Sequence, residues 1–227
     1  MNLKGRLYLI ANKVPKCEML ADIGTDHAFV PIYLVMEGKC KKGIASDIRK
    51  GPVEIARRNI NTYGLGDKIE TRIGAGLEPI DDENVDVVVI SGMGGELIIR
   101  ILKDDLEKAQ RAKTMIIQPM TAISEVRKWL LSNGFSIYDE ELIAEGRRIY
   151  TVICTKWTGT VEKIDYVHSL IGKKLIEKKD PLLNDYIDQR ISKLWKVING
   201  LKDSLHNNDE RIRKINELII KIEKLKI

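Results

Sequence analysis

Two carboxylates and a glycine are spaced as in the first two strands of a nucleotide-binding α/β domain. Asp22 and Gly24 lie in the stretch Leu-Ala-Asp-Ile-Gly-Thr-Asp-His-Ala, residues 20–28, and Asp47 ends a second apolar stretch 25 residues after Asp22. In such folds the glycine permits a tight turn from strand to helix. An acid at the end of the second strand accepts hydrogen bonds from both ribose hydroxyls of an adenosine-containing cofactor. These residues therefore predict a cofactor site.

The residues of the first turn distinguish between cofactors. A dinucleotide site carries the pattern G-x-G-x-x-G because its backbone must approach a pyrophosphate, but here Asp26 and Ala28 follow Gly24 at alternate positions. A carboxylate repels a pyrophosphate and attracts a cation. S-adenosylmethionine carries a sulfonium and an amino group and no phosphate, so Asp22 and Asp26 favour it over NAD. The alternative is that Asp26 only caps the helix that follows.

Two later segments could face the same ligand. Gly92-Met93-Gly94-Gly95 follows a β-branched stretch, residues 85–91, and Gln118-Pro119 follows another apolar stretch. The glycines would let a base or the cofactor approach the backbone, or they only pack a helix against the strand. The Gln118 amide could meet the edge of a base, or the proline simply ends the strand. Because parallel strands bind ligands at their carboxyl ends, we expect segments 22–27, 74–77, 91–95 and 118–120 to gather at one edge with Asp47.

The elements that must position these residues alternate along the chain. Apolar and β-branched patterns predict strands at residues 19–24, 42–47, 69–74, 85–91 and 114–118. Amphipathic patterns predict helices at residues 3–11, 27–37, 52–63, 96–106 and 124–133. This alternation indicates a parallel sheet with right-handed crossovers. The last two strands, 135–143 and 149–157, read as an antiparallel pair, which is typical of S-adenosylmethionine-dependent methyltransferases and unusual in Rossmann dehydrogenases.

The pattern changes after residue 158. Apolar residues then recur at alternating spacings of four and three, as in a coiled coil: Ile187, Ile191, Leu194, Ile198, Leu201 and Leu205. Asp180 can cap this helix, and Pro181 suits its first position. A turn at residues 206–208 precedes a second seam of Ile212, Ile215, Ile219 and Ile222. The two seams predict an antiparallel helical hairpin, and we divide the chain into domains at residues 1–158 and 159–227.

Composition limits the remaining possibilities. With 227 residues, 44% of them hydrophobic, the chain can form one α/β domain and a smaller module. We expect no membrane span, because no apolar run reaches about 18 residues. We also expect no signal peptide, because the N-terminus lacks the apolar core of one. Cys17, Cys40 and Cys154 are far apart and the three histidines are scattered, so we expect no metal site and free thiols in a reducing cytoplasm. Most of the net charge of +5 falls in residues 160–227, which suits either RNA binding or a solvated helical face.

The order of these motifs resembles the bacterial tRNA (adenine-22-N1)-methyltransferase family. The segments that match are Arg6-Leu7, 22–32, Gly51-Pro52, 90–95, Leu97-Ile98, Gln118-Pro119, Trp129-Leu130 and 133–135. The resemblance implies a Rossmann-like class I sheet with an all-α coiled-coil hairpin domain, and methyl transfer from S-adenosylmethionine to N1 of adenine 22 in tRNA. The chain departs from the family pattern at Ala75 (usually Asp or Asn), Phe29 (Tyr), Met120 (Asn) and Thr151 (Glu).

The expected site residues follow from this chemistry. Adenine N1 offers a lone pair and needs no strong base, so catalysis reduces to alignment and stabilisation of positive charge. We expect Asp26 to stabilise that charge and Gln118 to position the base, while His27 either contacts a substrate phosphate or is only packed. The cofactor residues are expected to be Asp22, Ile23, Gly24, Asp26, His27, Asp47, Ile48, Ala75, Gly76, Gly92 and Met93. The substrate residues are expected to be Arg6, Phe29, Gly94, Pro119, Met120, Arg147 and Arg148.

Two other functions fit the same sequence. A small-molecule methyltransferase would turn over without RNA, and a non-catalytic RNA-binding relative would not transfer a methyl group; the departures at Ala75 and Met120 favour the second of these. The helical tail could clamp RNA or serve as a dimer interface. We favour a monomer, because the hairpin can satisfy its own seam.

Overall fold

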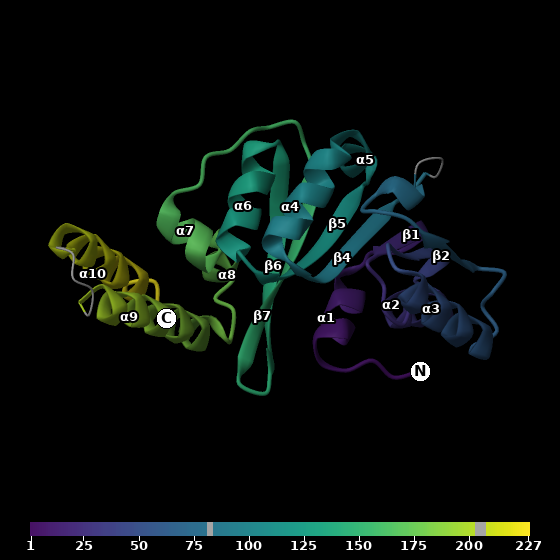
Figure 1. Ribbon diagram of the computed structural model, residues 1–227, viewed down its shortest axis with the longest axis horizontal. Helices are drawn as coiled ribbons and strands as arrows, with labels where there is room; N and C mark the ends of the chain where they lie inside the picture. The colour runs from purple at the N-terminus through teal and green to yellow at the C-terminus, as the bar shows by residue number, and fades with distance from the viewer. Residues whose placement is uncertain (81–83, 203–207) are drawn as a thin grey trace.

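The computed structural model describes residues 1–80, 84–202 and 208–227. A seven-stranded sheet lies at its centre, in the order β3-β2-β1-β4-β5-β7-β6 (Figure 1). The first five strands are parallel, and β7 and β6 join β5 in antiparallel fashion. The strands are β1 (Cys17–Ile23), β2 (Cys40–Asp47), β3 (Ile69–Ile73), β4 (Val87–Gly94), β5 (Thr114–Thr121), β6 (Phe135–Glu145) and β7 (Arg148–Trp157). The predicted parallel sheet with a closing antiparallel pair is confirmed.

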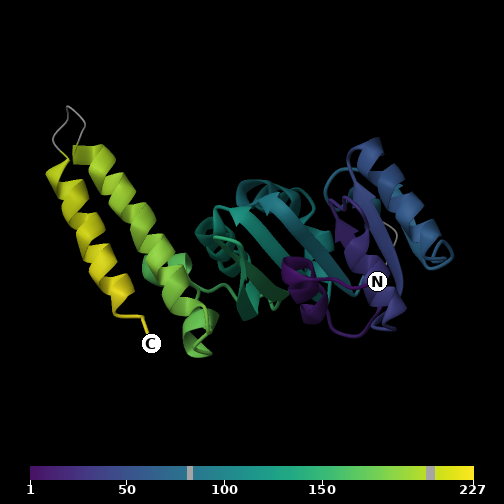
Figure 2. The ribbon, with the colours of Figure 1, turned by 90° about the horizontal axis from the view of Figure 1, so that it is seen from below.

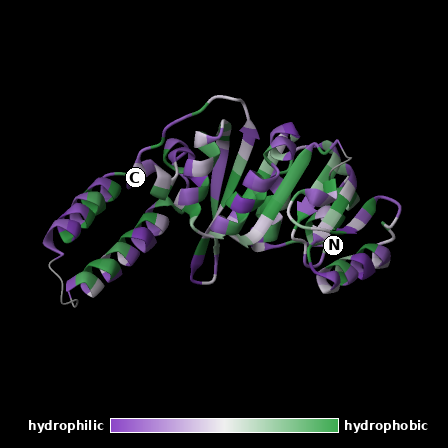
Figure 3. Ribbon diagram, turned by 45° about the horizontal axis from the view of Figure 1, so that its top comes forward, coloured by the Kyte–Doolittle hydropathy of each residue, from purple (hydrophilic) through white to green (hydrophobic). Residues whose placement is uncertain are grey.

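Helices cover both faces of the sheet. The apolar residues of α1 (Gly5–Lys13), α2 (Phe29–Met36) and α3 (Lys50–Thr62) form one core, and those of α4 (Gly95–Asp104), α5 (Leu106–Arg111) and α6 (Ile123–Ser132) form the other. The central strands supply alternate residues to the two cores: Val87 and Val89 of β4 face the first, Val88 and Ile90 the second. Residues 87–90 of β4 are therefore apolar on both faces, and the ribbon coloured by hydropathy shows green along the middle of the sheet (Figure 3).

The β6–β7 hairpin extends past the carboxyl ends of the parallel strands. Ile117 of β5 pairs with Ile153 of the antiparallel β7. From this pair, β5 continues to its end at Thr121, and β7 reaches back in the same direction to its start at Arg148. Its tip, residues 145–148, thus projects on the side where a ligand of such a sheet binds.

The described residues of the tail form four helices, of which the last two lie side by side (Figure 2). They are α7 (Tyr166–Ile171), α8 (Lys173–Glu177), α9 (Leu183–Lys202) and α10 (Asp209–Glu223). Most residues of the two predicted seams join one cluster with Leu142 of β6 and Ile149 of β7: Ile187, Ile191, Leu194 and Ile198 of the first seam and Ile212, Ile215, Ile219 and Ile222 of the second. The tail therefore packs on the β6–β7 hairpin. Leu205 and residues 206 and 207 of the predicted turn lie outside the described residues.

Buried polar contacts fix the tail to the sheet. The Arg127 and Glu140 side chains are 0% and 1% exposed and form an ion pair at 2.6 Å. Arg127 also donates hydrogen bonds to the carbonyl oxygens of Ser169 and Leu170 at the end of α7. The Asp180 carboxylate accepts from the Leu142 N–H and from the Leu182 N–H. The second of these bonds agrees with the predicted capping of the helix by Asp180.

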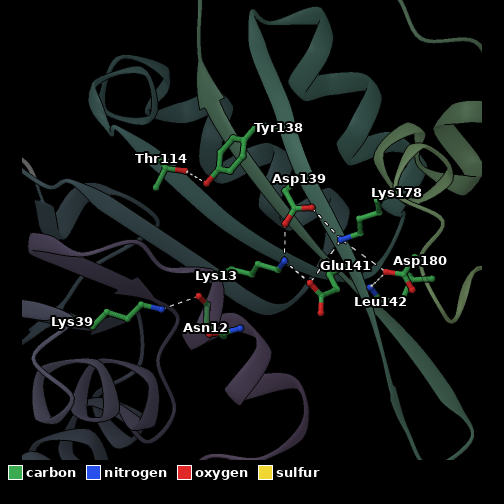
Figure 4. Close-up of polar contacts among 10 residues, drawn as sticks. All are labelled: Asn12, Lys13, Lys39, Thr114, Tyr138, Asp139, Glu141, Leu142, Lys178 and Asp180. Atoms are coloured by element: carbon green, nitrogen blue, oxygen red, sulfur yellow. Dashed lines mark hydrogen bonds and ion pairs between the residues drawn. The ribbon is translucent and has the colours of Figure 1, made fainter.

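A surface network connects α1, β6 and the segment after α8 (Figure 4). Lys13 and Lys178 both pair with the Asp139 and Glu141 carboxylates. Burial opposes ionisation of Asp139, but its bonds to the two ammonium groups outweigh that effect and lower its pKa. The sheet edge is thus bound to helices from both ends of the chain.

Some elements differ from the prediction. The helix expected at residues 96–106 breaks at Asp105, and α5 starts at once, so the long amphipathic stretch becomes two helices. The short α7 and α8 were missed because neither is long enough to show a helical period. None of the helices in the described ranges combines the length and apolar composition that crossing a membrane requires.

Candidate functional site at the carboxyl edge of the sheet

The turn after β1 is anchored on β2. Gly24, at φ +74°, and Thr25 both donate their N–H groups to the Ser46 carbonyl at 2.8 Å. The Thr25 hydroxyl accepts from the Ala28 N–H at 3.1 Å, and α2 has no side-chain cap. The alternative in which Asp26 caps this helix is therefore wrong.

Asp22 is buried at the end of β1. Its exposure is 6%, and burial raises the pKa of its carboxyl from 3.8 to about 6, although a hydrogen bond from the Thr25 side chain acts in the opposite direction. A carboxylate desolvated in this way interacts strongly with any cation that reaches it.

A cavity of about 330 Å³ opens beside this turn. The carboxyl ends of β1 and β2, the loop after β3 and one face of α4 enclose it, and its lining includes Ile23, Gly24, Ser46, Asp47, Ile48, Ala75, Gly76, Met93, Leu97 and Arg100. The Ser46 hydroxyl is buried and has no hydrogen-bond partner among the residues that the structure describes. A Cβ on Gly24 would lie 1.8 Å from Met93 Cε, so a side chain there would crowd the methionine that lines the cavity.

Hydrogen bonds within the protein hold polar groups in the other walls of the cavity. The Asp47 carboxylate accepts from the Arg49 N–H at 2.8 Å, and Ile48 beside it is 65% exposed. The Ala75 N–H donates to the Glu78 carboxylate at 3.0 Å. Sequence reasoning missed Ser46, Glu78 and the α4 wall. The sequence does contain a signal for the α4 wall, because residues on one face of a helix recur every three or four positions. The wall residues with this spacing are Leu97, Arg100, Ile101 and Asp104.

Gln118 supports the glycine-rich end of β4. It is fully buried; its amide oxygen accepts from the Gly92 N–H at 3.2 Å, and its amide nitrogen donates to the Pro119 carbonyl at 2.9 Å. Both ends of the amide thus have partners within the protein, and its predicted contact with the edge of a base stays a prediction. Gly92, at φ +77°, has open space where a side chain would be.

Asp26, His27 and Phe29 form a small platform. His27 Nε2 lies 3.2 Å from the Asp26 carboxylate, and these side chains are 44% and 70% exposed. The His27 and Phe29 rings stack at 4.9 Å with an interplanar angle of 10°. His27 is thus packed against an aromatic ring, the second of its two predicted roles, and still reaches solvent.

The basic residues predicted for the substrate fall into two groups. Arg6 Nη1 contacts Met120 Sδ at 3.0 Å, and its guanidinium carbon lies 4.9 Å from the centre of the Tyr150 ring. Arg147 and Arg148 are exposed at the hairpin tip, where the Arg147 carbonyl accepts from Gln189 of α9 at 3.3 Å. Both groups come from elements at the carboxyl edge.

The sequence-predicted residues thus lie along one edge, although they do not form a single cluster. Asp47, Ala75 and Met93 line the cavity, whereas the buried Asp22 does not line it and directly precedes its lining residue Ile23. Asp26 and Phe29 lie on the platform, and the arginines lie nearer β7. Within the described ranges, no group of three or more His, Cys, Asp or Glu side chains is placed to hold a metal ion.

Comparisons with known proteins agree with this geometry. Residues 3–153 match a family model described as a methyltransferase domain. The chain is 29% identical to a tRNA (adenine(22)-N(1))-methyltransferase of Bacillus subtilis, covering 100% of this chain and 96% of that protein. It is 32% identical to M. capricolum TrmK, solved with S-adenosyl-homocysteine, with a TM-score of 0.83 and coverage of 98% and 96%. It is also 30% identical to Streptococcus pneumoniae Sp1610, a putative tRNA (m1A22) methyltransferase solved with S-adenosyl-L-methionine, with a TM-score of 0.81 and coverage of 97% of both chains.

Proposed function

Because the chain belongs to the methyltransferase-domain family, and within it to the family of TrmK, we propose that it transfers a methyl group from S-adenosylmethionine to N1 of adenine 22 in tRNA. The observation that carries this proposal is the carboxyl-edge cavity, in a chain that matches these relatives along its whole length, including the helical tail. Such an enzyme is expected to work in the cytoplasm, where tRNA is modified.

The cavity fits the cofactor. S-adenosylmethionine supplies an electrophilic methyl group on a sulfonium. We assign the ribose hydroxyls to Asp47 and the cationic end to the buried Asp22, while Ile48, Ala75 and Gly76 would enclose the adenine. The unpartnered Ser46 hydroxyl offers one more polar contact.

The chain's own residues would align the base and stabilise charge. Adenine N1 attacks with its lone pair, and the methylated ring is cationic, so Asp26 would stabilise the developing charge from the platform. Phe29 would stack on the base. Gln118 acts as a positioning residue, because it holds the Gly92 N–H and with it the backbone of Gly92–Gly94 against which the base lies.

A base inside folded tRNA must leave its stack to reach such a site. We propose that the RNA backbone is bound by Arg6, by Arg147 and Arg148 at the exposed hairpin tip, and by the basic residues of the tail. The division at residue 158 would then separate a methyl-transfer domain from an RNA-holding domain. We propose a monomer, since the apolar residues of α9 and α10 face each other in one cluster.

The test is direct. Purified protein is incubated with labelled S-adenosylmethionine and unmodified tRNA, and the digested product is identified. We expect N1-methyladenosine. A labelled small molecule formed without RNA would favour the small-molecule methyltransferase, and cofactor binding without transfer would favour a non-catalytic relative.

The Asp47→Ala variant tests the assigned site through its affinity for the cofactor, measured by calorimetric titration. Loss of a hydrogen-bonded carboxylate costs about 1.5–3 kcal/mol, which is roughly a 10- to 150-fold weaker cofactor affinity. The matched control is Asp67→Ala, which removes an exposed carboxylate from the loop after α3. Equal affinities for the two variants would contradict the role of Asp47.

A further inference from the structure

Two cysteines face each other at the amino edge of the sheet, opposite the cofactor cavity. Cys17 is the first residue of β1 and Cys40 the first residue of β2, and they are direct partners in the parallel register. Paired residues of neighbouring strands point to the same face, with Cα atoms about 4.8 Å apart. A disulfide spans Cα separations of about 4.4–6.8 Å. The backbone thus already places the two thiols within bonding range.

The two thiols differ in access and ionisation. Cys40 is 2% exposed, whereas Cys17 is half-buried and lines a surface cavity with Lys16, Lys39 and Lys41. A hydrogen bond with Cys40 lowers the pKa of the Cys17 thiol and Lys39 adds to this effect, while burial and the Asp86 and Glu18 carboxylates oppose it. The same bond, together with burial, raises the pKa of the Cys40 thiol. Cys17 is therefore suited to react first, and Cys40 to remain a thiol beside it.

Cys154 provides an internal contrast. It is 1% exposed in β7, and burial raises the pKa of its thiol to about 12. A protonated thiol shielded from solvent is a poor nucleophile. The three cysteines of the chain therefore have different expected reactivities.

We propose that Cys17 and Cys40 form a thiol-oxidation site, at which a hydroperoxide produces an intramolecular disulfide. The Cys17 thiolate attacks one peroxide oxygen; the O–O bond breaks, and the leaving hydroxide takes a proton to become water. The Cys40 sulfur then attacks the sulfur of the Cys17 sulfenic acid, and the hydroxyl leaves with the Cys40 proton as a second water. Two thiols are oxidised and one hydrogen peroxide is reduced.

The site is independent of methyl transfer. It occupies the starts of β1 and β2, while Asp22, Gly24 and Asp47 lie at their carboxyl ends. Both cysteines begin their strands, so the small movement that bond formation needs falls on the strand ends and not on the middle of the sheet. Its test therefore does not depend on whether the proposed enzymatic function is correct.

The experiment treats the full-length protein with a small excess of hydrogen peroxide and follows its intact mass and a non-reducing peptide map. We expect a loss of two hydrogen masses and a peptide that joins Cys17 to Cys40. The Cys154→Ser control should give the same link at the same rate. In Cys40→Ser, Cys17 should instead gain one or two oxygen atoms. Iodoacetamide labelling of the untreated protein requires no substitution and should modify Cys17 well before the other two cysteines.

Three results would overturn the proposal. Cys17 and Cys40 could stay reduced in the wild type, Cys154 could be labelled or oxidised as fast as Cys17, or disulfide-linked dimers could form in place of the internal bond. Any one of these results would show that Cys17 and Cys40 do not form a reactive dithiol.

Discussion

Asp22 is a carboxyl group whose burial makes ionisation less favourable than it is in water. Burial at the end of β1 raises its pKa from 3.8 to about 6 in the native protein, whereas in the unfolded chain it is solvated. Between these two values the native state binds more protons than the unfolded state. Its contribution to the free energy of unfolding is therefore largest at the acidic end of this range and is lost as the pH rises through about 6.

The Asp22→Asn variant isolates this contribution. In cofactor-free protein, the free energy of unfolding of the variant relative to wild type should rise between about pH 4 and pH 7, because only the wild type has to bury a charge at the higher pH. Urea denaturation at several pH values measures the difference. Two stability curves that run parallel across this range would contradict the raised pKa.

Cofactor affinity should change in the opposite direction. The cationic cofactor pairs with ionised Asp22, so the wild-type affinity should increase as the pH rises through about 6, while the affinity of Asp22→Asn should be weaker and flatter over that range. Calorimetric titration of both proteins gives the comparison. This result would also separate a binding role of Asp22 from a merely structural one.

At the scale of the elements, the sequence was most informative where a pattern is repeated over many residues. The strands of the parallel sheet and the seams of α9 and α10 follow directly from apolar periodicity. The roles of Gln118 and Ser46 could not be derived in this way, because both depend on contacts with another strand or with a cavity. Strand ends could be placed at one edge from topology, but the direction in which the Gln118 amide points is decided by tertiary packing.

The buried Arg127–Glu140 pair joins α6 and β6 to the end of α7. Arg127→Met would leave the Glu140 carboxylate buried without its partner, which should cost about 3–5 kcal/mol of unfolding free energy. The double variant Arg127→Met/Glu140→Leu should recover much of this loss, because it removes the uncompensated charge. Denaturant titration of the two single variants and the double variant measures the coupling.

An exposed ion pair supplies the control for this cycle. Glu210 and Lys214 lie one turn apart on α10, and Lys214→Met should cost less than about 1 kcal/mol. If Arg127→Met were equally mild, the buried pair would not be what fixes the tail to the sheet.

In the molecule as a whole, the helical tail packs on the β6–β7 hairpin, whose tip carries Arg147 and Arg148. The β6–β7 hairpin projects beyond the carboxyl ends of the strands, and its tip contacts α9 through the bond from Gln189 to the Arg147 carbonyl. The tail packs on the same hairpin through Leu142 and Ile149. Under the proposed function, an RNA substrate contacts the tail, the hairpin tip and the cofactor edge in succession. A small-molecule substrate would need only the cofactor edge.

The double variant Arg147→Ala/Arg148→Ala tests this arrangement. Each arginine that contacts a phosphate releases about one counterion, so the salt dependence of tRNA affinity should become shallower by about one unit of slope per lost contact, and the affinity should fall at low salt. The matched control is Lys41→Ala/Lys42→Ala, which removes the same charge from two adjacent exposed residues at the amino end of β2. Cofactor affinity should stay unchanged in both variants, because neither pair lines the cavity. Fluorescence anisotropy with labelled tRNA over a range of salt concentrations measures the slopes. Identical slopes for the two variants would mean that the effect is one of net charge alone, and that the hairpin tip does not contact the RNA backbone.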